Sequence, residues 1–507
     1  MTENKSDKSE KKQEYPRKAK ELLKIIKAGD REDCLVETVQ REFAHPFSMT
    51  TLWICREYIH KLPEEVYHRN TPESMEFVAL RALLATMEGD LQGAETYAGI
   101  LGKTPRHLCS ECLEEQDWYR IVLELVMPYV SDNQFLHIIC FLRQIGANPV
   151  QSLTLSANRP SILNGFRDFT RFGRYLEKNK SLIMEIVGTL YGENGRGVCE
   201  IMLAEWYYQN NDCFHALVLV TGTIPMMESA KDMQCLFAGM ALQMKILLLN
   251  GQSQAAAPLV EKVRRRIQST GWEELTSSLN AMEARAACYE GRQDVVQEWL
   301  TRNAPDENGE LYMMDMYAYL IKIRCYLMMG KYMMAHVLAK QLIHLLKPAN
   351  RYMDLCECYM LSAFACYKAG SEEDMCGELE KALYLAKRYK YIRLLADEGN
   401  CMVRVLSIYW EKHGEDDFTR KIMVVAREVG KRFPDYMKSQ DEYYEPLTPT
   451  EKQILQLLAQ GLSYEEIGRK LDKKTGTVKF HGSGIFKKLE VKNRQQAVIR
   501  AEEIGLL

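Results

Sequence analysis

Basic side chains gather in the last sixty-one residues of the chain, residues 447–507. This segment contains eleven Lys and Arg against seven Asp and Glu, so its formal charge is +4, whereas the whole chain of 507 residues carries −3. Lysine and arginine hold phosphate oxygens, and threonine, serine and histidine form hydrogen bonds at base edges. A local positive excess on an otherwise acidic chain predicts a surface for nucleic acid.

Start and stop signals divide this segment into four short helices. Two capping boxes, Thr448-Pro449-Thr450-Glu451 and Ser463-Tyr464-Glu465-Glu466, open the first two helices, and Gly461 ends the first. Asn493 caps the fourth, with Gln496 three residues on. Apolar residues at helical spacing predict the buried faces: Ile454, Leu455, Leu457, Leu458, Ile467, Leu471 and Ile485. Two short helices followed by a longer, lysine-bearing one form a helix-turn-helix, which places its second helix in the major groove.

One pattern of residues runs through the segment without a gap: Leu447, Thr448, Pro449, Glu451, Leu455, Gly461, Ser463, Glu466, Ile467, Leu471, Thr477, Val478, Lys479, His481, Ile485, Lys488, Leu489, Val491, Arg494 and Ala497. This pattern resembles the DNA-binding domain of LuxR-type bacterial transcription regulators. The resemblance implies that double-stranded DNA is the partner, and that the last helix, residues 493–503, pairs two such domains as a homodimer on a two-fold site.

The third helix is expected to supply the contacts with DNA. Phosphate contacts are expected from the starts of the flanking helices and from three lysines: Lys479, Lys487 and Lys488. Base and groove contacts are expected from Thr475, Thr477, Phe480 and Ser483, with His481 as a further candidate.

Three glycines, Gly476, Gly482 and Gly484, fall inside this helix, and Lys474 stands where the family has a capping serine. Each interior glycine costs about 0.5–1 kcal/mol against alanine, and a missing cap costs about 1 kcal/mol. Gly482 also takes the place of a branched apolar residue, so we expect lost core packing and a frayed helix, which Gly482→Leu and Gly484→Ala would repair. The alternative is a protein-interaction scaffold whose degenerate helix-turn-helix no longer binds DNA. A salt-dependent DNA-binding assay on residues 440–507 separates the two hypotheses.

The length and composition of the chain predict several globular units. A chain of 507 residues is too long for one core, and 47% apolar with 27% charged residues is typical of soluble proteins. No apolar run approaches the roughly 18 residues that span a membrane. Residues 1–14 are charged and lack the apolar centre of a signal peptide, so we expect a disordered tail there. Fifteen irregularly spaced cysteines predict reduced thiols in a cytoplasm.

Residues 15–436 show helical periodicity and a recurring break. Helices end at Gly251, Gly291, Gly330 and Gly370, which are separated by 40, 39 and 40 residues, and Asn211 lies 40 residues before the first. An earlier copy is visible around Gly89, and small residues mark the helix crossings: Ala94, Ala216, Ala255 and Ala335. A fixed period near forty with helix, turn and helix predicts an all-α, tetratricopeptide-like solenoid, which would sense an unknown small molecule or protein. Residues 437–446, acidic and aromatic, form the expected linker.

The stretch from Leu52-Trp53 through residues 62–65 to Gly89-Asp90-Leu91 resembles the sensor region of the MalT-like group of large LuxR-type regulators. Those relatives carry an ATP-binding domain ahead of the solenoid, for which some fifty residues are too few. The one lookalike of a nucleotide-binding loop, residues 99–104, has Tyr97 where its first glycine belongs, so we expect no cofactor and no nucleotide binding.

No enzyme motif is present, and metal binding is not expected. His107, Cys109 and Cys112 lack a second ligand pair at similar spacing, unless folding brings Cys356 and Cys358 close.

Overall fold

The computed structural model describes residues 52–53, 55–68, 72–101, 155–156, 159–228, 233–270, 272, 275–437, 447–489, 491 and 493–503. The chain divides into two compact units, Met1–Tyr436 and Met437–Leu507. The described parts of both units are helical and contain no strand, only an isolated bridge between Asn164 and Asp168, so the all-α prediction is confirmed. Several predicted features lie outside the described residues: the tail 1–14, residues 102–104 of the lookalike loop, His107, Cys109, Cys112, and residues 438–446 of the linker.

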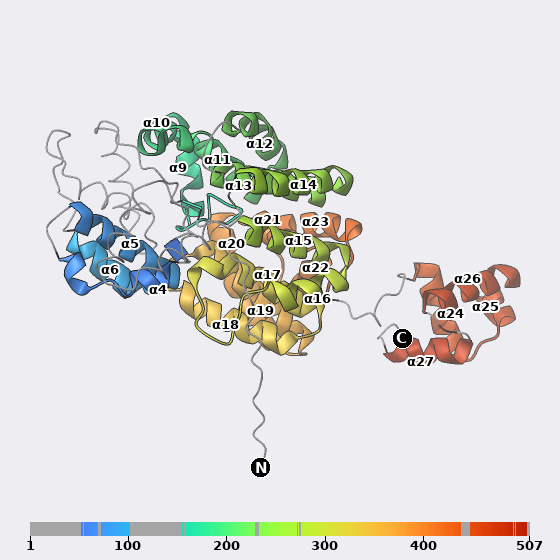
Figure 1. The fold of residues 1–507 in the computed structure, drawn as a ribbon. Helices are drawn as coiled ribbons and strands as arrows, with labels where there is room; N and C mark the ends of the chain where they lie inside the picture. The colour runs from blue at the N-terminus through green and yellow to red at the C-terminus, as the bar shows by residue number, and fades with distance from the viewer. Residues whose placement is uncertain are drawn as a thin grey trace, which may run out of the picture. The chain divides into compact units, whose positions relative to one another are not determined.

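The larger unit consists of successive helical hairpins, whose partner helices lie against each other (Figure 1). The hairpins are α5 (Pro72–Glu88) with α6 (Leu91–Ile100), α11 (Val198–Gln209) with α12 (Cys213–Met227), α13 (Gln234–Leu249) with α14 (Ser253–Thr270), α15 (Thr276–Glu290) with α16 (Gln293–Arg302), α17 (Met316–Met328) with α18 (Tyr332–Leu346), α19 (Tyr352–Lys368) with α20 (Glu372–Tyr389), and α22 (Asn400–His413) with α23 (Asp417–Arg432). Further helices outside these hairpins include α4 (Arg56–Ile59), α9 (Gly173–Lys178), α10 (Lys180–Tyr191) and α21 (Ile392–Ala396).

Each predicted break is a turn with a positive backbone φ. The angles are 87° at Gly89, 68° at Asn211, 80° at Gly251, 73° at Gly291, 72° at Gly330 and 80° at Gly370. Glycine and asparagine adopt this left-handed conformation at little cost, which ends one helix and lets the next reverse direction. A further glycine of this kind, Gly414 (φ 75°), separates α22 from α23. The forty-residue spacing misses it, because it follows Gly370 by 44 residues.

Small residues at the helix crossings are buried with one exception. Ala94, Ala216 and Ala335 are fully buried, as predicted. The prediction for Ala255 is wrong: it is exposed, and Ala256 is buried instead. Helix α14 begins at Ser253, and its orientation directs Ala256, not Ala255, toward the core.

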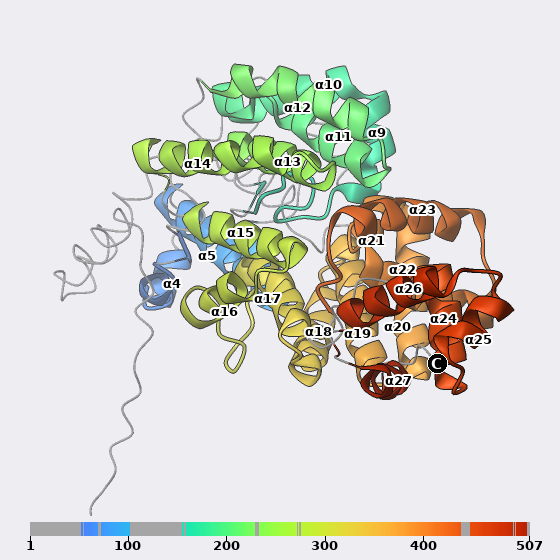
Figure 2. The same ribbon diagram turned by 90° about the vertical axis from the view of Figure 1, so that its right-hand side faces the viewer.

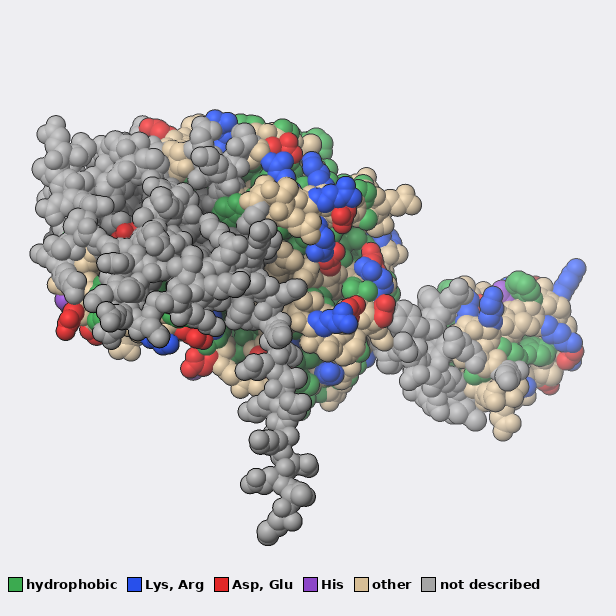
Figure 3. Space-filling model, in the orientation of Figure 1, with side chains coloured by type: hydrophobic (Ala, Val, Ile, Leu, Met, Phe, Trp, Pro, Cys, Tyr) green, Lys and Arg blue, Asp and Glu red, His purple; other side chains and the backbone are tan. Residues whose placement is uncertain are grey.

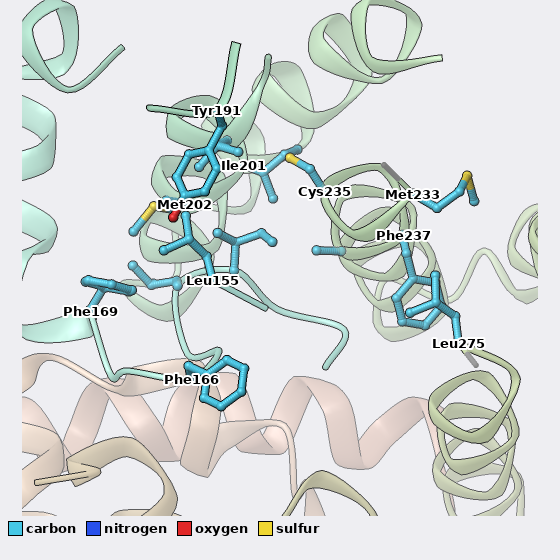
Figure 4. Packing of buried hydrophobic residues seen from close by; sticks show 14 of the residues in the cluster. Leu155, Phe166, Phe169, Tyr191, Ile201, Met202, Met233, Cys235, Phe237 and Leu275 are labelled. Carbon is cyan, nitrogen blue, oxygen red and sulfur yellow. The ribbon is translucent and has the colours of Figure 1, made fainter. Parts of the chain in front are cut away.

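An irregular segment before α9 is built into the larger unit, where the sequence predicted helix. Leu155, Phe166 and Phe169 pack into the same apolar core as Ile201 of α11 and Phe237 of α13 (Figure 4). Hydrogen bonds from buried side chains fix the position of this segment. Arg351 donates from Nη1 to the carbonyl oxygens of residues 165 and 166, at 2.8 and 2.5 Å, and from Nη2 to Asn164. Arg159 forms a bidentate pair with Asp354, at 2.9 and 3.0 Å.

The smaller unit contains α24 (Pro449–Ala459), α25 (Tyr464–Lys470), α26 (Thr475–Lys488) and α27 (Arg494–Glu503) (Figure 2). Gly461, with φ 92°, ends the first helix as predicted. A separate apolar core joins the four helices: Leu447, Ile454, Leu455, Leu457, Leu458, Ile467, Val478, Ile485, Leu489, Ala497 and Ala501.

Candidate nucleic-acid interface

Two capping boxes fix the starts of α24 and α25. The Glu451 amide donates to Thr448 Oγ1 at 3.2 Å, and the Thr448 amide donates to Glu451 Oε2 at 2.7 Å. Ser463 and Glu466 repeat the arrangement at 3.3 and 2.7 Å. Each box satisfies amides that the first helical turn leaves without a partner, so both helices begin where the sequence predicts.

Helix α26 has one buried face and one exposed face. Val478, Gly482 and Ile485 are buried against α24 and α25. Most of the predicted contact residues occupy the opposite, exposed side: Thr477, Lys479, Phe480, Ser483 and Lys487. The Phe480 side chain is 76% exposed, which is unusual for a large apolar group. Lys and Arg side chains stand out on the visible surface of this unit (Figure 3).

The remaining predicted contact residues, Thr475, His481 and Lys488, are half-buried. The Lys488 ammonium lies 2.7 Å from Glu451 Oε2. Burial acts to raise the pKa of Glu451, but Lys488 and the Thr448 amide together hold that pKa below its ordinary value. Lys488 therefore joins α26 to α24, a contact that the sequence pattern did not reveal.

The start of α26 lacks a side-chain cap, as predicted from Lys474 at that position. The three glycines of α26 are helical, and each has different surroundings. A Cβ at Gly482 would lie 3.0 Å from the Tyr464 ring, and a Cβ at Gly484 would lie 3.2 Å from Glu451 Oε1, whereas Gly476 faces open space. The expectation of lost packing at Gly482 is wrong, because Tyr464 fills the place that a branched side chain would occupy.

Helix α27, the last of the smaller unit, packs against α24, the first helix of that unit. The Asn493 side chain accepts from the Gln496 amide at 2.9 Å, which is the predicted cap. Arg494 donates to the Leu458 carbonyl oxygen, and Ala497 and Ala501 are fully buried. These contacts fix α27 against α24.

Neither a metal cluster nor a membrane span is found in the part of the chain that the structure describes. No group of three or more His, Cys, Asp and Glu side chains there could hold a metal ion. Cys356 and Cys358 are buried free thiols, and the first donates to the Ala382 carbonyl oxygen at 3.2 Å. No described helix is long and apolar enough to cross a bilayer.

Comparison with known proteins finds one matching family in each unit. Residues 193–412 match the family described as MalT-like TPR region, and residues 445–501 match the family of bacterial regulatory proteins, luxR family. A segment of 78 residues is 44% identical to the transcriptional regulatory protein DesR of Bacillus subtilis, covering 15% of this chain and 39% of that protein. A segment of 94 residues is 40% identical to the response regulator protein VraR of Staphylococcus aureus, covering 18% of this chain and 42% of that protein. The chain thus spans about two-fifths of the length of these curated relatives.

Proposed function

Because residues 193–412 belong to the MalT-like TPR region and residues 445–501 to the LuxR family of bacterial regulatory proteins, we propose that the chain is a DNA-binding transcription regulator. In this proposal the helical repeat responds to a ligand or partner, and the C-terminal helix-turn-helix binds duplex DNA. The names of the relatives, a transcriptional regulatory protein and a response regulator, support the same reading.

The observation that carries the proposal is the outer face of α26. Thr477, Phe480 and Ser483 are exposed on a helix whose other side is anchored in the core, so their side chains are available to base edges. Lys479 and Lys487 are exposed on the same helix and would hold phosphates, with Lys488 as a third phosphate candidate. Thr475 and His481, at the border of this face, complete the proposed set.

The proposed function is tested by the salt dependence of DNA binding by the full chain. Each phosphate contact releases condensed counterions, so the logarithm of the affinity falls linearly with the logarithm of salt concentration. Lys479→Ala and Lys487→Ala should each reduce that slope by about one, for all duplex sequences. Lys421→Ala is the control, because Lys421 is an exposed lysine of the larger unit, on α23. A folded chain that binds no duplex at low salt would favour the scaffold hypothesis.

The proposal includes pairing of two copies through α27 on a two-fold site. Since Ala497 and Ala501 face the core of the unit, an exposed residue such as Gln495 is available for a second copy. Duplexes selected by the full chain from a random pool should contain two inverted half-sites, each occupied by one copy. A selected site without internal symmetry, bound by a single copy, would contradict the pairing.

A further inference from the structure

Helix α12 of the larger unit is apolar on its exposed side as well as on its buried side. The buried side, which includes Ala216 and Val220, packs against α11 and α13. On the exposed side, Phe214 is 74% exposed and Val218 is 54% exposed. Of the α-helices in the described part of the chain, α12 alone contains no Asp, Glu, Lys or Arg. A helix that is apolar all round is normally covered all round, so we expect a partner for the exposed side.

A glycine stands in the middle of this exposed side. Four residues share it at spacings of four, four and three: Phe214, Val218, Gly222 and Pro225. A Cβ at Gly222 would face open space, so no neighbour in the structure requires a glycine there. Glycine also destabilises a helix relative to alanine, because its backbone is freer in the unfolded chain. A second helix that crosses closely over Gly222 accounts for the glycine, since only a residue without a side chain leaves room at the crossing.

The exposed side of α12 is complementary to itself when two copies meet antiparallel. With a two-fold axis at the level of Val220, Val218 of one copy faces Gly222 of the other. Phe214 of one copy likewise faces the turn of the other that contains Pro225. Large side chains thus meet small or flat ones, and no charged side chain of α12 is buried without a partner. An acidic or basic partner, by contrast, would find no counter-charge on this side of the helix.

Charges of opposite sign border the two ends of α12. Asp212, whose side chain is 39% exposed, caps the start of the helix. At the other end, Glu228 lies 3.4 Å from the Lys262 ammonium, and its carbonyl oxygen accepts from Arg266. That end therefore carries two basic side chains against one acidic side chain. Antiparallel pairing brings the acidic end of one copy to the basic end of the other, which favours this orientation over a parallel one.

We propose that the exposed side of α12 docks a second copy of this chain, with the two α12 helices antiparallel and Gly222 at their crossing. The contact belongs to the larger unit, whereas the pairing on DNA through α27 belongs to the smaller unit. Docking through α12 does not require DNA.

Pairing is measured as the mass of the full chain without DNA, by sedimentation velocity at micromolar concentration. The parent should be a dimer. Val218→Glu should raise its dissociation constant about tenfold or more, because an ion enters an apolar contact. Since Val218 is exposed, the helix content of this variant, measured by circular dichroism, should equal that of the parent. Val337→Glu is the matched control, because Val337 is a 47% exposed valine on α18, and Gln495→Arg on the exposed side of α27 should also leave the dimer intact.

The antiparallel register is tested by mixing Val218→Glu with Gly222→Lys. Each variant alone should be mainly monomeric. An equal mixture should form dimers, because the introduced carboxylate of one copy faces the introduced ammonium of the other. Gly222→Glu replaces Gly222→Lys in the control mixture, where two carboxylates would meet and no dimer should form.

Three outcomes would overturn the proposal. A monomeric parent would mean that α12 has a different occupant. A dimer that Val218→Glu leaves intact, or that Val337→Glu dissociates equally, would place the contact on another surface. A mixture of Val218→Glu with Gly222→Lys that stays monomeric would exclude the antiparallel register. Because no DNA is present, none of these outcomes counts against the proposed function.

Discussion

Lys488, in the last turn of α26, forms a 2.7 Å ion pair with Glu451, in the first turn of α24. The two side chains are 17% and 7% exposed, and the same Glu451 oxygen accepts from the Thr448 amide. One carboxylate thus closes the cap of the first helix and positions the C-terminal end of the helix proposed to enter DNA.

Replacing Lys488 with Met should destabilise the C-terminal unit by about 1 kcal/mol, because the partly buried Glu451 loses its counter-charge. The folded-state pKa of Glu451 is lowered in the parent, so its contribution is present above the ordinary value of 4.5 and is lost as pH falls below it. Urea unfolding followed by amide exchange in α24–α27, at pH 7 and pH 3, should show the loss mainly at pH 7. Lys487→Met is the control, since Lys487 is exposed, and an equal loss in both variants would contradict the role of the pair.

Gly482→Leu should destabilise the C-terminal unit by about 1–3 kcal/mol, because its side chain would meet the Tyr464 ring 3.0 Å from the Cβ. Gly476→Ala should instead stabilise α26 by about 0.5–1 kcal/mol, since that position faces open space. Thermal unfolding of the full chain, with exchange to identify the unit, measures both effects. Adding Tyr464→Ala to Gly482→Leu should recover part of the loss; a Gly482→Leu variant more stable than the parent would show that Tyr464 does not occupy the site.

Phe480→Ala should weaken binding to a selected duplex and reduce discrimination between bases, while leaving the salt slope unchanged. The ring is 76% exposed and carries no charge, so it can contact thymine methyl groups but cannot release counterions. Competition binding against duplexes with thymine replaced by uracil tests this directly, since the parent should prefer thymine and the variant should not. Lys479→Ala provides the contrast, with a flatter salt slope and unchanged base preference.

Glu205→Gln should flatten the pH dependence of stability between about pH 4.5 and pH 7. Burial raises the pKa of Glu205 to about 7 from an ordinary 4.5, even though Ser161 and the Ile162 amide donate hydrogen bonds to it. The folded chain therefore binds more protons than the unfolded chain in this window, and stability falls as pH rises through it, by up to about 3 kcal/mol. Melting temperatures across the window measure the slope. A parent that gains stability from pH 5 to pH 7 would contradict the assignment.

Local features of this protein could be predicted from the sequence because their causes lie within a few residues. The boxes at Thr448 and Ser463 join residues three apart, and the turns at Gly251 and Gly370 need only a backbone that tolerates positive φ. Most of the α26 residues that the sequence singled out for contact with DNA are exposed in the structure.

Only the tertiary structure decided which residues distant in sequence meet. Tyr464 fills the space over Gly482, Lys488 reaches Glu451, and Glu398 joins Arg285 to Tyr436, across 113 and 38 residues. None of these pairs has a local signature, because a charged or aromatic side chain on a helix is compatible with many partners until packing selects one. The sequence by itself therefore determined the helices and their turns, whereas the packing of the helices determined the ion pairs between them.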